Sequence, residues 1–502
     1  MSEHMSQKQL ESYLWGAAVI LRGLVDAGDY KQFIFPLVFF KRLSDVWDED
    51  YEIALMESKG DIGYSVATAN DRFSIPKGAH WSDIRAVGKD VGKKLDVALR
   101  AIESANPKRL AGIFGDAPWT NKDRLPDVTL KNLIEHFSGQ TLSIANVPED
   151  ELGNGYEYLI KKFADDSGHT AQEFYTNRSV VHLMVQMLEP RPRESIYDPT
   201  CGTGGMLISA LAEVKRKGGE HRTLKLYGQE RNHMTASIAR MNLVLHGVED
   251  SRIERGDTLL MPAFCEKDAV KTFDVALANP PYSIKQWDRD AWVSDSWGRN
   301  FLGTPPQGRA DFAFFQHILK SLDPNTGRCA ILFPHGVLFR KEELELRKNL
   351  VESDLVDCVL GLGPNLFYNS PMESCVVFCR SVKPPEKRGM VLFIDAIHEI
   401  VRERNMSFLS PEHQNRIQQA YKAYADEDGF AKVAAIADIA AQSYSLSIPL
   451  FVGRKIAELA PTGDTTVDLS VHKALAEWNQ SSREFWREMD GVVGLVGSLV
   501  PE

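Results

Sequence analysis

Short segments rich in β-branched and aromatic residues alternate with helical segments from about residue 194 onward. This alternation constrains the fold more than any other feature, because strands separated by helices of roughly 10–15 residues form βαβ units and a mostly parallel sheet. In such a sheet, ligands bind at the carboxyl ends of the strands. The strand-like segments lie at 195–197, 224–227, 273–278, 329–333, 355–360 and 374–379, and the helical patterns at 206–215, 232–246, 312–322 and 342–351.

Helical patterns without strand signals flank the alternating region. Within residues 10–137, apolar side chains such as Leu14, Ala18 and Leu21 recur at three- and four-residue spacing. After about residue 397 the chain is polar and helical again, with an alanine-rich stretch at 431–442. We therefore expect an N-terminal helical domain at 1–145, an α/β domain at 146–400 and a C-terminal helical region at 401–502.

Composition places the chain among ordinary globular proteins. It has 502 residues, of which 43% are hydrophobic and 25% charged, and this length predicts two or three domains. The N-terminus lacks the basic and apolar regions of a signal peptide. The densest apolar run, 33–40, is far shorter than the roughly 20 residues that span a bilayer. We expect a cytoplasmic protein without a membrane segment.

The cysteine pattern argues against two kinds of covalent or metal framework. The chain has six cysteines and no CxxC pair, which predicts neither a disulfide scaffold nor a zinc site. Cys375 and Cys379 flank Val376-Val377-Phe378, so we expect both thiols on the same face of a buried strand, where free cysteine behaves as a small apolar residue.

A glycine-rich turn, DPTCGTGG at 198–205, follows the first strand-like segment and opens a helix. Glycines at such a turn let the backbone approach a ligand closely, and the helix N-terminus offers unpaired N–H groups. The turn alone leaves the ligand open, because similar turns bind dinucleotides or simply pack tightly.

Two carboxylates follow the next two units of the predicted sheet. Glu230 follows the strand-like segment 224–227. In nucleotide-binding sheets, a carboxylate at this position accepts hydrogen bonds from both hydroxyls of a ribose. Asp257, in Gly256-Asp257-Thr258, could face an adenine amino group. Alternatively, Glu230 is a solvated loop carboxylate, and Asp257 belongs to a simple turn without a ligand.

The cluster Asn279-Pro280-Pro281-Tyr282 comes directly after the strand-like segment 273–278. Two prolines fix an extended backbone and supply no N–H groups, so the Asn279 side-chain oxygen and the Pro280 carbonyl are able to accept from one exocyclic NH₂ group. Two acceptors direct the weakly nucleophilic nitrogen of an adenine toward a methyl donor. Tyr282 would stack on that base once it leaves the duplex. A proline-rich loop without chemistry is the alternative.

Two further segments are candidates for the site. EFYTNR at 173–178 precedes a helical pattern and is either a binding site for a methionine carboxylate at a helix N-terminus or only a helix entry. The polar segment 283–310 carries Trp287, Trp292 and Trp297. We expect it either to be mobile without DNA and close over an extruded base as a lid, or to form a rigid surface insertion.

The order of 173–178, 198–205 and 279–282 resembles the gamma-ordered amino-methyltransferases of DNA. Within that group the chain is similar to the modification subunits of Type I restriction-modification systems, to which LWGAA at 14–18 and FFKRLSD at 39–45 also correspond. The resemblance covers nearly the whole chain. It implies a Rossmann-like S-adenosylmethionine-dependent methyltransferase sheet and a DNA N6-adenine methyltransferase.

The resemblance also implies roles for individual residues. The cofactor contacts would be Glu173, Phe174, Tyr175, Thr176, Asn177, Arg178, Asp198, Thr203, Gly204, Gly205, Glu230 and Asp257, and the catalytic loop would be Asn279, Pro280, Pro281 and Tyr282. Asp198 and Asp257 would serve the methionine amine and the adenine, respectively. Asn177 stands where the family commonly has proline, and Tyr282 where it often has phenylalanine. Phe367 is a candidate second aromatic wall for the base. No metal is expected.

The resemblance further implies DNA, a specificity subunit, a second copy of this chain and a restriction subunit as partners. The net charge of −11 fits a chain that does not grip DNA alone, because DNA affinity comes largely from basic residues on phosphates. There is no GxxxxGK[ST] phosphate loop, so we assign ATP-driven translocation to another chain.

Three alternatives remain at this stage. A stand-alone DNA adenine methyltransferase would need its own target-recognition domain, for which the sequence shows no long insertion. Enzymes that methylate a protein glutamine amide or an RNA base share the Asn-Pro-Pro-Tyr cluster, but they would leave the helical flanks unexplained. A non-catalytic scaffold is disfavoured by intact Asn279, Glu230 and glycine turn.

Overall fold

The computed structural model describes residues 5–166, 176–248, 251–366, 373–403 and 406–453. The expected contacts Glu173, Phe174, Tyr175 and Phe367 therefore lie outside the described residues, as does 454–502. Within the described part of the chain, no helix combines the length and apolar character needed to cross a membrane.

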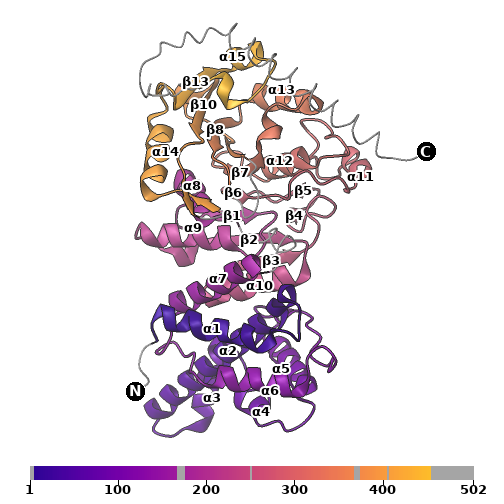
Figure 1. The fold of residues 1–502 in the computed structure, drawn as a ribbon, viewed down its shortest axis with the longest axis vertical. Helices are drawn as coiled ribbons and strands as arrows, with labels where there is room; N and C mark the ends of the chain where they lie inside the picture. The colour runs from indigo at the N-terminus through magenta and orange to yellow at the C-terminus, as the bar shows by residue number, and fades with distance from the viewer. Residues whose placement is uncertain (1–4, 167–175, 249–250, 367–372, 404–405, 454–502) are drawn as a thin grey trace, which may run out of the picture. The chain divides into compact units, whose positions relative to one another are not determined.

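Helices α1, α2 and α4 to α7 build the N-terminal part around one apolar core, and α3 packs against α2 (Figure 1). Aromatic side chains fill much of it, as in the edge-on pairs Phe33–Trp119 and Phe39–Phe114. The core also takes in α7, so it extends past the expected boundary at residue 145. The elements are α1 (Gln7–Leu21), η1 (Ala27–Asp29), α2 (Tyr30–Glu57), α3 (Ile62–Arg72), α4 (Trp81–Arg85), α5 (Val91–Ala105), α6 (Asp127–Ser138) and α7 (Glu149–Asp166).

The alternating region forms one nine-stranded sheet with the order β13-β10-β8-β9-β7-β6-β1-β2-β3. All neighbours pair in parallel except that β9 and β13 run antiparallel to theirs. The expected mostly parallel α/β sheet is confirmed. The strands are β1 (Ser195–Asp198), β2 (Lys225–Glu230), β3 (Ser251–Arg255), β6 (Val275–Ala278), β7 (Arg328–Pro334), β8 (Val356–Leu362), β9 (Ser374–Arg380), β10 (Met390–Ala396) and β13 (Ala431–Ala435).

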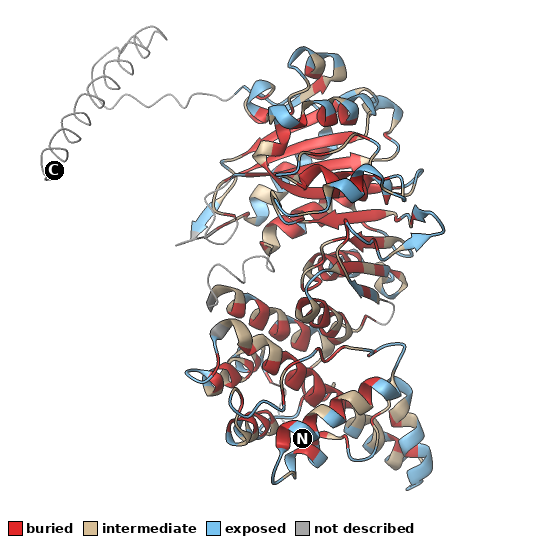
Figure 2. Cartoon of the chain, turned by 90° about the vertical axis from the view of Figure 1, so that its right-hand side faces the viewer, coloured by how far each residue is buried: buried red, intermediate tan, exposed pale blue. Residues whose placement is uncertain are grey.

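Helices cover both faces of this sheet, and the strands are buried between them (Figure 2). Alternate residues of one strand serve the two sides: on β7, Ala330 and Leu332 join one core, while Ile331 and Phe333 join the other. The first core includes α8 (Arg178–Leu188), α9 (Gly205–Arg216), α10 (His233–Leu245) and α14 (Pro411–Ala423), and the second includes α12 (Asp311–Lys320), α13 (Leu344–Glu352) and α15 (Ile436–Ala441).

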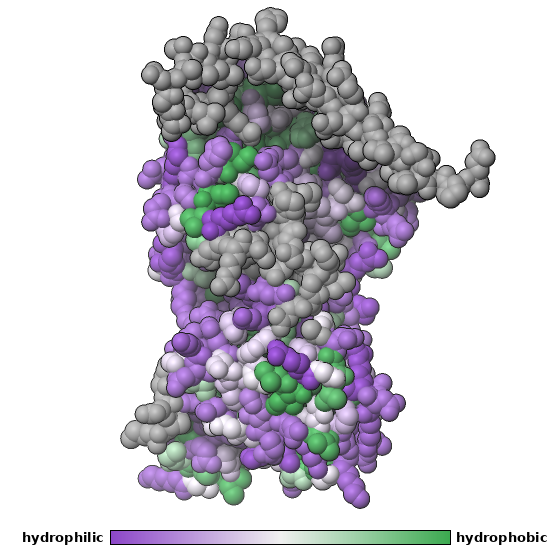
Figure 3. All heavy atoms as spheres, viewed as in Figure 1, coloured by the Kyte–Doolittle hydropathy of each residue, from purple (hydrophilic) through white to green (hydrophobic). Residues whose placement is uncertain are grey.

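Hydrophilic residues cover most of the coloured surface in Figure 3, where apolar residues form small separate patches.

Short elements complete the described chain. The remaining elements are η4 (His221–Thr223), the hairpin β4 (Cys265–Glu266) and β5 (Ala269–Val270), α11 (Arg289–Val293), η5 (His335–Leu338), η6 (Lys341–Glu343), η7 (Pro385–Lys387), the hairpin β11 (Val401–Glu403) and β12 (Met406–Phe408), and η8 (Ile448–Leu450).

Helix α10 belongs to two cores at once. Its residues Ile238, Met241 and Leu245 pack into the core of the N-terminal helices, whereas Ala239 and Leu243 pack under the sheet. The spacing of three and four residues places each set on one face of the helix. A single helix thus joins the N-terminal helices to the sheet.

The sequence predicts a helical segment after residue 400, but part of this segment forms a strand. Residues Ala431–Ala435 form strand β13, which pairs antiparallel with β10 at the edge of the sheet. The expectation of a helix over 431–442 is wrong for this part, because pairing with β10 satisfies the backbone and outweighs the helix propensity of alanine. Within 431–442, the helix is confined to α15 (Ile436–Ala441).

The two cysteines predicted on one strand face are confirmed there. Cys375 and Cys379 lie on β9 and join the same core. All six cysteines are free, and only Cys265 is exposed.

Residues 283–310 are anchored by a buried arginine. The Arg299 guanidinium pairs with Asp295, donates to the carbonyls of Thr258 and Leu259 at 2.8 Å each, and lies over the rings of Trp292 and Trp297. These contacts favour the rigid insertion over the lid.

Candidate active site

Three of the predicted site residues lie where strands end on the same edge of the sheet. Asp198 is the last residue of β1, Glu230 is the last residue of β2, and Asn279 directly follows β6. Since β1 pairs in parallel with both β2 and β6, the carboxyl ends of the three strands lie next to one another.

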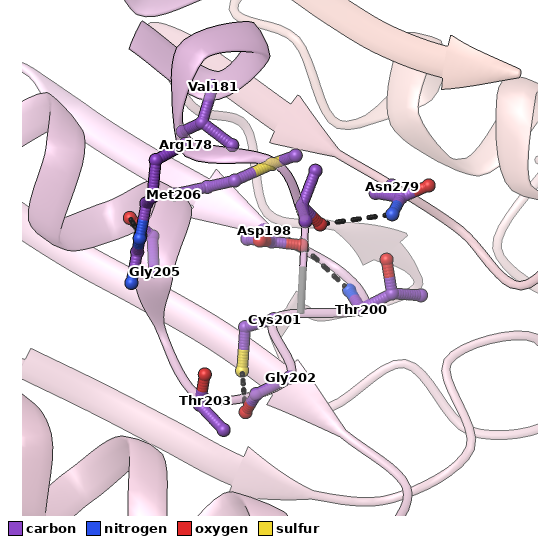
Figure 4. A pocket seen from close by; sticks show the side chains of 11 residues that line it. Arg178, Val181, Asp198, Thr200, Cys201, Gly202, Thr203, Gly205, Met206 and Asn279 are labelled. Atoms are coloured by element: carbon purple, nitrogen blue, oxygen red, sulfur yellow. Dashed lines mark hydrogen bonds between the residues drawn. The ribbon is translucent and has the colours of Figure 1, made fainter. Parts of the chain in front are cut away.

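A pocket opens at this edge and unites residues from three separate parts of the sequence (Figure 4). It encloses about 440 Å³, including space open to solvent. The entry to α8, the glycine-rich turn and the start of the Asn-Pro-Pro-Tyr loop all contribute to its wall. The lining residues are Thr176, Arg178, Val181, Asp198, Thr200, Cys201, Gly202, Thr203, Gly205, Met206 and Asn279.

Asp198 is a buried carboxylate in the wall of this pocket. Its Oδ1 accepts from the backbone N–H of Thr200 at 3.0 Å. Burial raises the pKa of Asp198 to about 8, and the nearby Glu230 carboxylate adds to the rise against the hydrogen bonds from Thr200. Because the charged form is destabilised without a partner, this site favours a cationic group next to Asp198.

The Glu230 carboxylate stabilises the glycine-rich turn by accepting a hydrogen bond from its backbone. Its Oε2 accepts from the N–H of Gly202 at 3.1 Å, and its Oε1 accepts from the N–H of Asn232 at 2.7 Å. The backbone of the turn is tied to the same strand, since the N–H of Cys201 donates to the carbonyl of Gln229. The Glu230 carboxylate therefore contacts the turn, although Glu230 is not among the residues that line the pocket.

The turn uses glycine where the backbone requires it. Gly202 and Gly204 have φ angles of 53° and 82°, in the left-handed region that side chains other than glycine rarely adopt. At Gly205, an added Cβ would lie 2.4 Å from Nη1 of Arg178. This close approach lets Arg178 donate to the carbonyl of Gly205 at 3.0 Å while it pairs with Glu157.

Asn279 is oriented by Thr176, which lies just before α8 and also lines the pocket. Its Nδ2 donates to Oγ1 of Thr176 at 3.0 Å (Figure 4). The amide nitrogen is thereby used within the protein, and the Oδ1 atom is the part of the side chain suited to accept from a substrate.

Asn177 is not brought into the pocket. Its side chain accepts from the N–H of Ser179 at the start of α8 and donates to the carbonyls of Leu366 and Ser407. The buried asparagine therefore connects three separate segments. This packing explains how the chain uses asparagine at the position where proline is common in the resembling family.

Several other expected residues lie beside the pocket and not in its wall. Asp257 uses Oδ1 to accept from the N–H groups of Leu259 and Leu260, and its Oδ2 lies 3.7 Å from Arg231. The lining does not include Gly204, Pro280, Pro281 or Tyr282 either.

The pocket also contains residues that the sequence analysis did not single out. Val181 and Met206 form its apolar part, from the first turns of α8 and α9. Both residues lie in the first turn of a helix that begins at a predicted binding segment, and this position was the signal by which the sequence could have identified them. Among the described residues, no group of three or more His, Cys, Asp and Glu side chains is arranged to hold a metal ion.

The resemblance implies that Glu230 contacts the cofactor, and this expectation is testable on the isolated chain. Glu230→Ala should weaken S-adenosylmethionine binding by about 10- to 100-fold, because it removes a charged acceptor and the support of the glycine turn. Isothermal titration calorimetry measures this, with Glu254→Ala on the neighbouring strand β3, where Glu254 is exposed, as the control. Equal affinities in both variants would remove Glu230 from the site.

Two family models match the chain. The model described as N-6 DNA Methylase matches residues 147–458, and the model described as HsdM N-terminal domain matches residues 10–137. The first match covers more than half of the chain and includes all described residues of the pocket.

Similar proteins of known family support the same assignment. The MjaIX methylase subunit of a Type I restriction enzyme from Methanocaldococcus jannaschii is 30% identical, over 89% of this chain and 84% of that protein. The HindI methylase subunit from Haemophilus influenzae is 30% identical, over 77% of this chain and 87% of its own length.

A solved structure extends this similarity to the fold. The crystal structure of a type I restriction-modification methyltransferase subunit from Streptococcus thermophilus matches with a TM-score of 0.78 and 29% identity, over 90% of this chain and 100% of that one. With the pocket, these similarities show that the chain belongs to the N-6 DNA methylase family, as a methylase subunit of the Type I restriction-modification systems.

Proposed function

We propose that the pocket at the carboxyl ends of β1 and β6, together with the neighbouring end of β2, binds S-adenosylmethionine, and that the methyl group of this cofactor is transferred there to the N6 amine of a DNA adenine. The observation that carries this proposal is the lining of a single pocket by both Asp198 and Asn279. The first belongs to the proposed cofactor site and the second to the proposed catalytic loop.

The methionine end of the cofactor is assigned to Asp198 and the glycine-rich turn. Its ammonium group supplies the positive charge that the buried Asp198 carboxylate favours. Backbone N–H groups at the start of α9, around Thr203 and Gly205, suit its carboxylate, because helix N-termini favour anions. Arg178 adds a positive charge to the same wall.

The nucleoside end is assigned to Glu230 and Asp257. Glu230 lies at the end of β2, where its carboxylate is suited to accept from the ribose hydroxyls. Asp257 follows β3 in the adjacent loop, and we propose that it faces the adenine of the cofactor. S-adenosylmethionine itself supplies an electrophilic methyl group on a sulfonium.

Asn279 and Pro280 perform the chemical step in this proposal. Asn279 Oδ1 and the Pro280 carbonyl accept hydrogen bonds from the two N–H groups of the target amine, which makes its nitrogen more nucleophilic and aims it at the methyl group, so that the N–CH₃ bond would form as the S–CH₃ bond breaks. The hydrogen bond from Asn279 Nδ2 to Thr176 supports this orientation of the amide. The pocket receives the adenine only after it has left the duplex.

Tyr282 is proposed as the stacking surface for that adenine. Burial keeps the pKa of its phenol well above the usual range, so the hydroxyl stays protonated and is unsuited to act as a base. We expect Tyr282→Phe to retain methylation within about threefold and Tyr282→Ala to lose about 10- to 100-fold, since stacking on one base contributes about 1–3 kcal/mol. Steady-state kinetics measure both. Equal losses would assign a chemical role to the phenol.

We propose that a separate specificity subunit selects the DNA sequence. The net charge of −11 limits the phosphate contacts of this chain, and the helical parts outside the pocket are suited to pack against partner helices. In this arrangement the C-terminal region 401–502 serves assembly, and two copies of the chain each act on one adenine of a split target. A restriction subunit joins the complete assembly.

The test compares the chain alone with the chain purified together with its specificity subunit. We expect only the complex to methylate a duplex that carries the target sequence, and neither to methylate a scrambled duplex. Mass spectrometry of the product should show N6-methyladenine. Full sequence-specific activity of the chain alone would favour a stand-alone enzyme, and N4-methylcytosine would contradict the assignment of the base.

A further inference from the structure

The catalytic loop ends on a residue with an unusual backbone conformation. Ser283, which directly follows Tyr282, has a φ angle of 51°. Residues other than glycine adopt this left-handed region rarely, and they keep it when surrounding contacts hold them there. The contacts of Ser283 therefore bear on the geometry of the four residues before it.

Asp311 supplies the first of these contacts. The N–H of Ser283 donates to Asp311 Oδ1 at 2.9 Å, and the Ser283 hydroxyl lies 3.5 Å from Oδ2. Asp311 is the first residue of α12, and its side chain is completely buried. A carboxylate on a helix that packs against the sheet is a rigid acceptor for the end of the loop.

Arg340 supplies the second contact and also holds Asp311. Its Nη1 donates to Asp311 Oδ2 at 2.7 Å, and its Nη2 lies 3.4 Å from the Ser283 hydroxyl. The guanidinium packs against Gly336, where an added Cβ would lie 2.4 Å from Nε. The backbone carbonyl of Arg340 in turn accepts from Nη1 of Arg347 at 2.6 Å.

We infer that Asp311 and Arg340 are positioning residues for methyl transfer, which hold Ser283 in its left-handed conformation and thereby fix Asn279 and Tyr282 against the target base. The inference rests on the proposed function of the catalytic loop. It assigns no contact with cofactor or DNA to either residue. Both act from outside the Asn-Pro-Pro-Tyr cluster, on the segment that follows it.

A second carboxyl group lies near the same guanidinium without replacing Asp311. Glu343 Oε2 is 3.6 Å from Arg340 Nη1. Burial raises the pKa of Glu343 to about 7 against the pull of Arg340, and Asp311 adds to the rise. Asp311, which accepts directly from Arg340 at 2.7 Å, is therefore the closer partner of the guanidinium.

The test uses the complex of this chain with its specificity subunit. Arg340→Ala should lower kcat for methylation by about 10- to 100-fold, because displacement of reacting groups by about 1 Å has effects of this size. Arg340→Lys should recover part of the loss, since lysine reaches Asp311 but not Ser283 at the same time. The KM for S-adenosylmethionine and the affinity for DNA should stay unchanged.

A matched control separates positioning from general stability. Arg380 on β9 pairs with Asp357 on β8 at 3.0 Å in a similarly buried ion pair, next to the amino end of β7 and therefore at the edge of the sheet opposite the proposed site. Arg380→Lys should change the melting temperature about as much as Arg340→Lys and leave kcat unchanged. Asp311→Asn, combined with Arg340→Ala, should cost no more activity than the worse single variant, because the two residues act as one unit.

Several outcomes would overturn the inference. An unchanged kcat in Arg340→Ala or Arg340→Lys would do so, and a loss of DNA affinity would make Arg340 a DNA contact instead. Asn279→Ala, measured in parallel, distinguishes this failure from that of the proposed function. If Asn279→Ala is inactive while the Arg340 variants are fully active, only the positioning role fails, whereas an active Asn279→Ala contradicts the proposed catalytic loop itself.

Discussion

Replacing Asn279 with alanine is expected to lower kcat for DNA methylation by about 1,000-fold and to leave the affinity for S-adenosylmethionine unchanged. The variant removes an acceptor that is needed chiefly as charge develops on the amine, and the loss of one such preorganised group costs about 10²- to 10³-fold in rate. Single-turnover kinetics of the complex with the specificity subunit measure the rate, and calorimetry measures the affinity.

A second substitution at the same position tests the orientation of the amide. Asn279→Asp keeps an oxygen in place of Oδ1 and loses the hydrogen-bond donor to Thr176. We expect it to be more active than Asn279→Ala and less active than the wild type. Since Asn279 lines the pocket, a parallel fall in cofactor affinity in Asn279→Ala would instead make it a cofactor-binding residue and contradict the catalytic role.

Asp198→Asn is expected to stabilise the protein without cofactor and to weaken cofactor binding by about 100-fold. The pKa of Asp198 is raised from its ordinary value of 3.8 to about 8, mainly by burial. The folded protein therefore holds a proton that the unfolded chain releases, and stability falls as the pH rises from about 4 to about 8. Asparagine removes this loss, so the difference in melting temperature should grow between pH 5 and pH 8.

The expected size of the stabilisation follows from the same shift. One pKa unit corresponds to about 1.4 kcal/mol, so Asp198→Asn should add roughly 2–5 kcal/mol to the free energy of unfolding at pH 8. Asp274→Asn is the matched control with the opposite sign. Against the effect of burial, hydrogen bonds from Ser195 and Thr326 lower the pKa of Asp274, so its removal should destabilise the protein.

Proton release gives a further measure of the role of Asp198. A cationic group bound beside it lowers its pKa, so cofactor binding at pH 7 should release up to about one proton. Calorimetry in buffers with different ionisation enthalpies detects this release, which should be absent in Asp198→Asn. Wild-type binding without proton release, or a variant that binds as tightly as the wild type, would place the ammonium elsewhere.

The sequence was sufficient to predict the mostly parallel class of the sheet, the strands β1, β2, β6, β7, β8 and β9, and the strand ends of the site, but not β3, β10 or β13. The alternation of strand and helix patterns has a clear physical origin, since each strand needs an apolar cover and each crossover needs a helix. Asp198, Glu230 and Asn279 were predicted at strand ends, and the structure places them there. Local sequence order determines these positions, because each follows directly from where a strand stops.

Other features depend on contacts between distant residues and were not predictable. Strand β13 lies in an alanine-rich segment whose local propensity is helical, and only pairing with β10 determines its conformation. Arg299 lies in a polar segment without periodicity, yet Asp295, two tryptophans and two backbone carbonyls bury it. The Asp311–Arg340 pair joins residues that are 29 positions apart.

The two-sided packing of α10 limits how this subunit can diverge or be recombined. Ile238, Met241 and Leu245 lie in the sheet domain by sequence but complete the core of the N-terminal helices. A hybrid joined near residue 145 would combine α1 to α6 of one parent with α7 and α10 of another, and mismatched apolar surfaces would meet inside that core. A functional crossover near residue 145 therefore requires matched residues on the face of α10 that packs against α2 and α7, and natural variation on that face should be coupled to variation in these two helices.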